Sequence, residues 1–291
     1  MQWKGTVLVK PIEDQQLTSI TVIRAAAWEQ YDWLRHGFST RSGGVSSVYG
    51  ASSLNLGWTK EDDPALVAEN RRHFLGAVTG KADGNAGFML VTERQIHSAI
   101  SHVIREENEP FSGKLQTPEG KATLEGDGLM TNLSGVMLGV GTADCVPVLV
   151  ADVKNRTVAA FHAGWRGTAA RIVEHGIAKM TKAYDSHPAD IVAAIGPSIG
   201  ACCYAVGEEV RTAFATQFNY ADNLFRENYL DLWKANRRQL LDAGLAERQI
   251  TVIGECTACT RDSHGDRRYY SHRGEHGVTG RMLNVVGTVR E

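Results

Sequence analysis

Unbroken apolar runs are concentrated in the middle of the chain. They predict buried strands at 136–141, 146–153, 157–161 and 191–195, because a strand covered on both faces carries apolar residues continuously. Shorter apolar runs predict further strands at 7–9, 20–23, 88–91, 101–104 and 249–253. The pattern therefore indicates a molecule built around buried β-structure.

Helical periodicity predicts four helices among these strands. Asp63 and Pro64 are typical of an N-cap and a first helical residue, and apolar residues then recur at helical spacing up to Ala77. The other helices are expected at 167–184, 207–218 and 229–243, and a turn-rich loop is expected at 42–46. Because helices and strands alternate only loosely, we expect one α/β domain with a mixed sheet. Residues 1–35 are expected to form an N-terminal β-like extension that packs on a catalytic domain formed by 36–291.

Composition and charge exclude several classes of protein. The chain has 291 residues, a hydrophobic fraction of 43% and a formal net charge of −2, so no basic field favours a nucleic-acid partner. We expect no membrane partner, because no apolar run approaches the roughly 18 residues that a membrane span needs. The first residues contain no apolar signal-peptide core, and the five cysteines are an odd number. We therefore expect a cytoplasmic protein whose cysteines are thiols or metal ligands.

Cys145 and His162 are the first candidates for chemistry. Cys145 opens an apolar strand, and His162 follows an apolar run 17 residues later. Two antiparallel strands joined by a short turn fit this interval, so the two side chains are expected to meet at one end of a sheet. The alternative is a buried thiol and a hydrogen-bonded core histidine, since free cysteine is among the most buried residue types.

His97, between two predicted strands, would complete a set of one cysteine and two histidines. Three such ligands with one open position are typical of a catalytic zinc site. A thiolate and two imidazoles suit zinc or copper and do not suit magnesium or calcium. The same residues also fit a cysteine nucleophile with a histidine base, and Asp144 is a candidate for orienting the imidazoles.

The other cysteines and Arg41 carry weaker patterns. Cys256 and Cys259 form a C-x-x-C with no second pair at zinc-ribbon spacing, so we interpret them as structural or incidental thiols. Cys202 and Cys203 are adjacent and follow a glycine-containing segment that favours either a ligand contact or a tight turn. Arg41, on a Gly-Gly loop, is a candidate anion ligand or an exposed surface residue. None of the ten histidines forms an H-x-H pair.

A set of motifs running from about His36 to Met282 is characteristic of one family. The chain resembles the laccase-domain purine nucleoside phosphorylases, also described as the polyphenol oxidase or peptidoglycan-editing-factor family. The combination of T-A-D-C at 142–145 with H-A-G-W-R-G at 162–167 is highly specific. The other matching motifs are G-F-S-T-R-S-G-G-V-S (37–46), S-L-N-L-G (53–57), E-N-R-R (69–72), Q-I-H (95–97), I-G-P-S-I-G-x-C-C-Y-x-V-G (195–207) and T-G-R-M (279–282).

The resemblance implies a fold, an activity and a site. The implied fold is a single-domain layered α/β sandwich with mixed sheets, related to deamidating toxins that use a Cys-His pair. The implied activity is phosphorolysis of adenosine, inosine and methylthioadenosine, with some adenosine deamination. The family's zinc ligands, also described as binding copper, fall on His97, Cys145 and His162, which are then the catalytic residues. Arg41 and Asn55 are expected to contact substrate or phosphate, in a monomer or homodimer whose partners are purine nucleosides and phosphate.

The sequence departs from the family pattern at two segments. The family's Phe-Ser-Tyr/His-Arg-Arg segment reads Y-S-H-R-G at 270–274, and G-D-G stands at 126–128 where the family commonly has Ala-Asp-Ala or Ala-Asp-Gly. Neither change touches the three metal ligands. Two further functions stay open, a copper-dependent polyphenol oxidase and a non-enzymatic metal-binding factor of cell-wall assembly or editing.

Overall fold

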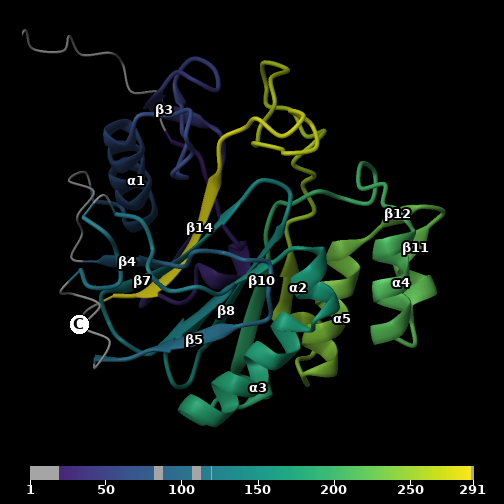
Figure 1. Cartoon of the computed structure of the whole chain (residues 1–291). Coiled ribbons are helices and arrows are strands. Elements are labelled where there is room, and N and C mark those ends of the chain that lie inside the picture. Colours follow the sequence, from purple (N-terminus) through teal and green to yellow (C-terminus); the bar gives the residue numbers. More distant parts are fainter. Residues whose placement is uncertain (1–19, 82–87, 107–112, 119, 290–291) are drawn as a thin grey trace, which may run out of the picture.

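Two β-sheets stacked face to face between two helical layers form the molecule. The computed structural model describes residues 20–81, 88–106, 113–118 and 120–289 (Figure 1). In Figure 1, α1 lies against the outer face of one sheet, and α2 to α5 lie on the opposite side of the molecule, next to the other sheet. The predicted strand at 7–9 lies outside the described residues.

The sheet beside α2 to α5 has six strands. Its order is β13-β10-β8-β9-β6-β5. The β10–β13 and β5–β6 pairs are parallel and the other pairs are antiparallel, so the sheet is mixed. Its strands are β13 (Ile250–Val252), β10 (Ile191–Ile195), β8 (Val146–Asp152), β9 (Thr157–Ala163), β6 (Gly128–Thr131) and β5 (Ser101–Ile104).

The sheet beside α1 has five strands in the order β1-β2-β14-β7-β4. Only the β4–β7 pair is parallel, so this sheet is mixed as well. The proposed boundary between 35 and 36 falls inside β2, which pairs with β1. The strands are β1 (Val22–Ile23), β2 (Leu34–Ser39), β14 (Met282–Thr288), β7 (Val136–Thr142) and β4 (Met89–Thr92).

Helices lie in the four segments in which the periodicity predicts them, with two corrections. Asp63 caps α1 by accepting a hydrogen bond from the Ala65 amide, as predicted. The single helix predicted at 167–184 is wrong, because Arg171 takes a left-handed conformation (φ 58°) and divides it into α2 and α3. The helix predicted from 229 begins only after Asp231, whose side chain caps it by accepting from the Lys234 amide. The bounds are α1 (Pro64–Thr79), α2 (Trp165–Ala169), α3 (Ile172–Tyr184), α4 (Glu208–Gln217) and α5 (Leu232–Asp242).

Short elements complete the fold and correct the turn-rich loop predicted at 42–46. That segment is a strand, β3 (Ser42–Ser46), in which Gly43 takes a positive φ of 96° that glycine tolerates best. A Cβ at Gly44 would lie 2.4 Å from the Ser53 carbonyl oxygen, so the close approach of these segments requires glycine there. The remaining elements are β11 (Phe225–Arg226), β12 (Tyr229–Leu230), η1 (Ala26–Trp28), η4 (Pro188–Asp190), η5 (Ala221–Leu224) and η6 (Glu247–Gln249).

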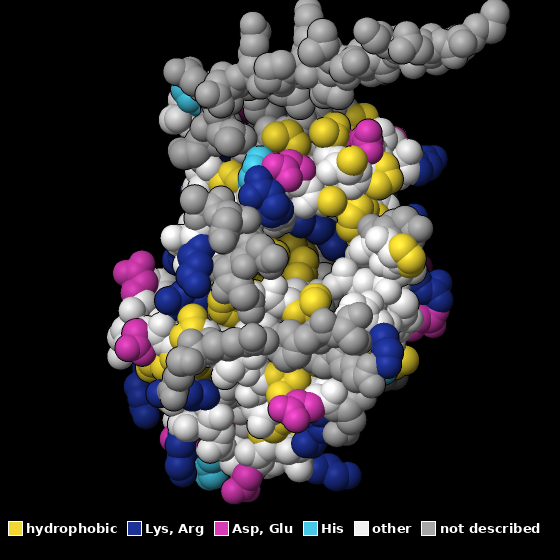
Figure 2. All heavy atoms as spheres, turned by 90° about the vertical axis from the view of Figure 1, so that its left-hand side faces the viewer, with side chains coloured by type: hydrophobic (Ala, Val, Ile, Leu, Met, Phe, Trp, Pro, Cys, Tyr) yellow, Lys and Arg dark blue, Asp and Glu magenta, His cyan; other side chains and the backbone are white. Residues whose placement is uncertain are grey.

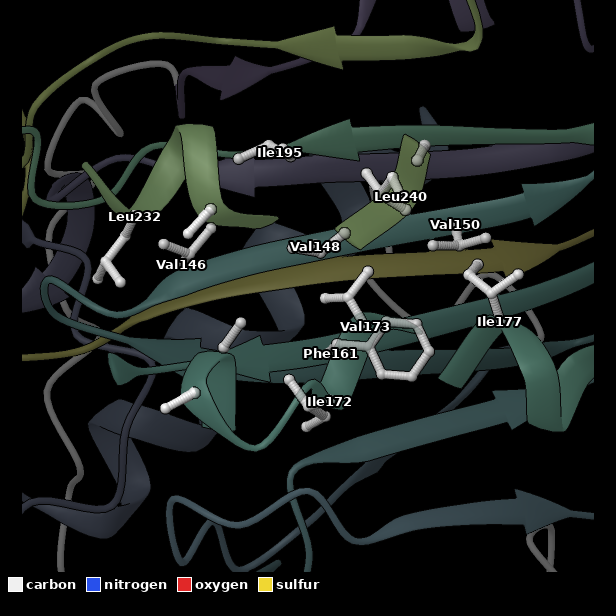
Figure 3. Close-up of a cluster of buried hydrophobic side chains, with 14 of the residues drawn as sticks. Val146, Val148, Val150, Phe161, Ile172, Val173, Ile177, Ile195, Leu232 and Leu240 are labelled. Carbon is white, nitrogen blue, oxygen red and sulfur yellow. The ribbon is translucent and has the colours of Figure 1, made fainter. Parts of the chain in front are cut away.

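Burial on both faces explains the unbroken apolar strands. In β8, Val146, Val148 and Val150 pack with α3 and α5 (Figure 3), whereas Leu149 and Ala151 point between the two sheets. Successive side chains of a strand point to opposite faces, so a strand between two cores has no solvent-facing position. This arrangement confirms the predicted single-domain layered α/β sandwich with mixed sheets; the relation to Cys-His toxins stays a prediction.

Two further observations bear on partners. None of the described helices is long and apolar enough to cross a membrane. On the face shown in Figure 2, Lys and Arg side chains are spread among acidic and polar ones and form no continuous basic stripe.

Candidate active site and metal centre

A cavity of about 750 Å³ opens where several strands of both sheets end. Its lining includes the residues that follow β4 and β7 and those at the adjoining ends of β8 and β9. This is the edge of the sheets at which β14 starts, close to the loop that precedes β14 and is drawn in yellow in Figure 1. Among the lining residues are His97, Cys145 and His162, so the structure brings the three predicted ligands together.

The pairing of β8 with β9 places Cys145 beside His162. The strands are antiparallel, Val146 lies opposite Ala163, and Pro147 lies opposite His162. Cys145 and His162 therefore meet at one sheet end, as their spacing in the sequence predicts. A Cβ at Gly164 would lie 2.9 Å from the Cys145 sulfur, so glycine is needed for the chain to pass the thiol.

Asp127 holds the loop that presents His97. The backbone amides of Ile96, His97 and Ser98 donate to its carboxylate at 3.3, 3.0 and 2.6 Å, and the Ser98 hydroxyl donates at 2.8 Å. Successive amides that converge on one anion require an unusual backbone, and His97 takes a left-handed conformation with φ 60°. The loop therefore folds around a buried carboxylate at the start of β6.

The same carboxylate orients His162. Its Oδ1 lies 2.7 Å from His162 Nδ1, and both side chains are almost completely buried. A histidine held at Nδ1 by a carboxylate has its Nε2 free to bind a metal, which is the usual outer-shell arrangement of metal-binding histidines. The sequence analysis named Asp144 for this role. In the structure Asp144 accepts hydrogen bonds from the Thr257 hydroxyl and the Arg273 amide instead, each at 2.6 Å.

Three ionisable groups of the site have shifted pKa values. Burial opposes the charge of Asp127, but the hydrogen bonds from His162 and Ser98 outweigh it and lower the pKa to about 2. Burial also opposes ionisation of the Cys145 thiol, yet His162 and His97 together lower its pKa to about 6. Burial likewise disfavours the His162 imidazolium, while Cys145 and Asp127 raise its pKa to about 9. Cys145 is thus prepared to act as a thiolate, the form that binds metals and attacks electrophiles.

The donor set fits a zinc ion. The ligand atoms of His97, Cys145 and His162 all lie within 4.8 Å of one another, and the Cys145 sulfur is 3.9 Å from His97 Nε2. Zinc bond lengths of about 2.0–2.3 Å place sulfur and nitrogen ligands roughly 3.5 Å apart in a tetrahedral site. His97 is exposed and His162 is buried, so the site has one open side that faces the cavity.

Arg41 and Asn55 are not among the residues that line the cavity. The Arg41 guanidinium pairs with Glu275 at 2.9 Å, donates to the Tyr49 carbonyl and lies over the Tyr270 ring. Asn55 is fully buried; its amide donates to Asp62, and its carbonyl oxygen accepts from the Arg281 amide. The cations that line the cavity are Arg71, Arg94, Lys121, Arg273 and Arg281. Asn55 therefore affects the cavity indirectly, because it holds the backbone of Arg281, and Arg281 lines the cavity.

Glu93 is a buried acid in the lining of this cavity that the sequence analysis did not single out. Neither carboxyl oxygen accepts a hydrogen bond of normal length from the described residues, and His102 Nε2 lies 3.9 Å from Oε1. Burial, and after it the negative charge of Asp127, raise the pKa of Glu93 to about 9. The acid is therefore protonated at neutral pH and leaves Asp127 as the charged carboxylate of the site.

Replacing Glu93 by glutamine is expected to stabilise the protein. The folded-state pKa of Glu93 lies above its unfolded value, so wild-type stability falls as the pH rises from about 4.5 to about 9. The glutamine side chain does not titrate, so the advantage of the variant should grow over that window and should reach about 3 kcal/mol by pH 7. The measurement is urea unfolding at pH 5 and pH 8. Glu125→Gln, which removes an exposed carboxylate paired with Arg94, is the control expected to change little; an equal response of both variants would contradict the prediction.

The chain is similar to known proteins over most of its length. A family model described as multi-copper polyphenol oxidoreductase laccase matches residues 35–289. A purine nucleoside phosphorylase of Deinococcus radiodurans is 37% identical over 257 residues, covering 88% of this chain and 89% of that protein. A protein named adenosine deaminase RL5, from an unknown prokaryotic organism, is 36% identical over 233 residues, covering 78% of this chain and 85% of that protein. The crystal structure of the hypothetical protein YfiH of Bacillus licheniformis has a TM-score of 0.79 at 31% identity, covering 93% of this chain and 96% of that chain.

Proposed function

The chain belongs to the multi-copper polyphenol oxidoreductase laccase family, and we propose that it is a cytoplasmic, zinc-dependent purine nucleoside phosphorylase, active as a monomer or homodimer. Relatives in the comparison are named purine nucleoside phosphorylase and adenosine deaminase. The observation that carries the proposal is the cluster of His97, Cys145 and His162 in a cavity large enough for a nucleoside. Adenosine, inosine and methylthioadenosine are the proposed substrates, with adenosine deamination as a slower side activity.

The side chains of the cavity support zinc as the proposed metal, in preference to a set of copper ions. A zinc ion held by His97, Cys145 and His162 would supply a Lewis acid at the cavity wall. Among the described residues, this is the one group of three or more close potential ligands that contains an imidazole. Multicopper oxidases need several histidine-rich centres, so these ligands favour one mononuclear metal site in the cavity.

Aromatic side chains provide surfaces for the purine. Trp58, Trp165 and Tyr204 all line the cavity. A base stacked on an aromatic ring gains roughly 1–3 kcal/mol without regard to its exocyclic groups. This tolerance agrees with a proposed substrate range that includes both amino and oxo purines.

Cationic side chains provide a place for phosphate. Arg71 and Arg281 line the cavity on the side of Trp58, with the Arg71 guanidinium 4.7 Å from the Trp58 ring centroid. Arginine recognises phosphate through two parallel N–H donors. Arg41 stays a proposed phosphate contact that would have to leave Glu275. Comparing the phosphate KM of Arg41→Lys with that of Arg281→Lys separates the two residues.

The proposed reaction exchanges one bond at the sugar for another. A phosphate oxygen bonds to the anomeric carbon, and the bond from that carbon to the purine breaks. The purine leaves with the electron pair and takes up the proton that hydrogen phosphate gives up, through an oxocarbenium-like state of the kind known from glycoside hydrolysis. Asp127 keeps His162 and the His97 loop fixed meanwhile, because its carboxylate binds both.

The test is phosphate-dependent release of free base. Zinc-loaded protein is expected to convert inosine and phosphate to hypoxanthine and ribose 1-phosphate, and to lose this activity after chelation until zinc is returned. Ammonia release from adenosine without phosphate would report the deaminase activity. Protein that releases no base from inosine, adenosine or methylthioadenosine at high phosphate contradicts the proposal. In that case, oxygen uptake with phenols after copper loading would identify a polyphenol oxidase, and its absence would favour the non-enzymatic cell-wall factor.

A further inference from the structure

Four of the five cysteines gather in a second cluster outside the candidate active site. Cys202 and Cys203 follow β10, and Cys256 and Cys259 follow β13. Their sulfur atoms all lie within 4.8 Å of one another, and those of Cys202 and Cys259 are 3.6 Å apart. The thiols of two segments that are remote in sequence thus form one compact group.

The spacing of the sulfurs matches a tetrahedral metal site. Zinc–sulfur bonds of about 2.3 Å place the sulfurs of a four-cysteine site roughly 3.8 Å apart. Disulfide pairing would bring two sulfurs to about 2.05 Å and separate the four thiols into pairs. One compact group of four sulfurs is the arrangement of a closed structural zinc site, in which no position is left for substrate.

The backbone around Cys256 is arranged to stabilise a thiolate. The Gly200 amide donates to the Cys256 sulfur at 3.3 Å, and the amides of Ala258 and Cys259 also point at it. Two of these donors come from the C-x-x-C turn itself and one from the facing segment, so both halves of the cluster are folded around the sulfur. Amide donors to a ligating sulfur are the outer-shell partners that orient metal ligands.

We propose that Cys202, Cys203, Cys256 and Cys259 bind a structural zinc ion, distinct from the metal in the cavity. This proposal gives Cys256 and Cys259, interpreted from the sequence as structural or incidental thiols, a structural role as metal ligands. The adjacent pair supplies the partner that the C-x-x-C lacks at zinc-ribbon spacing.

This second zinc ion ties together two segments that form the cavity wall. Tyr204, next to Cys203, lines the cavity. Thr257, next to Cys256, donates to Asp144, which also lines the cavity and stands directly before Cys145. Backbone hydrogen bonding joins the two segments. Ser198 and Cys256 form an isolated parallel β-bridge, and the Thr257 amide donates to the Ser198 carbonyl. The ion would therefore fix the loops that position cavity residues while touching no substrate.

Zinc counts in matched variants test this inference independently of any catalytic activity. Wild-type protein purified under reducing conditions without chelators is expected to hold two zinc ions per chain. Cys259→Ser and Cys145→Ala should each hold one, and the double variant none. A wild-type protein with one zinc ion whose content is unchanged in Cys259→Ser overturns the proposal.

Two measurements keep the test decisive if Cys259→Ser does not fold. Cobalt loaded into Cys145→Ala should give an intense thiolate-to-cobalt charge-transfer band, because the four remaining cysteines are then the sulfur ligands. Zinc should also protect these four thiols of the wild type from alkylation, and chelation should expose them. Absence of both effects, or a non-reduced mass spectrum that shows these cysteines joined in disulfides, contradicts a zinc site.

Discussion

Replacing Cys145 by alanine is expected to abolish phosphorolysis while leaving the fold largely intact. The variant removes the sulfur ligand of the proposed cavity metal and leaves two imidazoles, of which His97 is exposed. Loss of a mere outer-shell partner already lowers metal affinity or activity about 10–100-fold, so loss of a ligand should exceed about 100-fold. Cys145 is only half-buried, and the change from cysteine to alanine leaves a small gap, so the unfolding midpoint should move little.

The measurement combines base release from inosine with zinc content. If the four-cysteine cluster holds its own ion, the zinc count falls by one and not to zero. Cys259→Ser is the reciprocal variant, because it removes a sulfur from the other cluster and none from the cavity. A Cys145→Ala protein that keeps wild-type activity, or unchanged zinc content in single alanine variants of all three ligands, would remove this trio from the metal site.

The local pattern of apolar residues was sufficient to predict the strands that are buried on both faces. The strands β8, β9 and β10 stand in unbroken apolar runs, and the short turn between β8 and β9 made their antiparallel pairing predictable. That pairing alone brought Cys145 and His162 to one sheet end. The prediction worked because the two residues are linked through neighbouring strands, so that no long-range contact had to be known.

The strand β14 could not be predicted in the same way. It follows a polar segment, and Asn284 and Gly287 interrupt its apolar positions. Its neighbours β2 and β7 are remote in sequence, and the buried Asn284 is satisfied by the Val140 carbonyl and the Thr142 hydroxyl. A buried amide with such partners is compatible with a central strand, but only the assembled sheet reveals them.

The same reason explains why Asp127 and the cysteine cluster were missed. Asp127 stands in a Gly-Asp-Gly segment that resembles an ordinary turn, and its five hydrogen-bond donors come from the 96–98 loop and His162. Cys202 and Cys203 are separated from Cys256 and Cys259 by the elements from α4 to β13. Asp144, by contrast, directly precedes Cys145 in the sequence, but its carboxylate accepts a hydrogen bond from the Thr257 hydroxyl. Proximity along the chain favoured the wrong carboxylate.

Asp127→Asn is expected to weaken cavity metal binding about 10–100-fold, with a loss of activity at least as large. Asparagine has the shape of aspartate, but one carboxylate oxygen becomes an amide that can only donate. That amide must face either the N–H groups of the 96–98 loop or the Nδ1–H of His162. In the first case the His97 loop loses its anchor. In the second case His162 accepts at Nδ1, carries its proton on Nε2 and can no longer bind a metal there, the tautomer fault known from triads of the same geometry.

A chelator competition that measures the zinc dissociation constant tests this prediction, and Asp152→Asn provides the matched control. Asp152 is also a fully buried carboxylate that accepts backbone and side-chain donors from Lys154 and Asn155. It ends β8 at the edge of the sheet opposite to Cys145. Both variants should lower the unfolding midpoint, but only Asp127→Asn should change the dissociation constant of the cavity zinc. Equal zinc affinity in the two variants would show that Asp127 stabilises the fold without orienting the metal ligands.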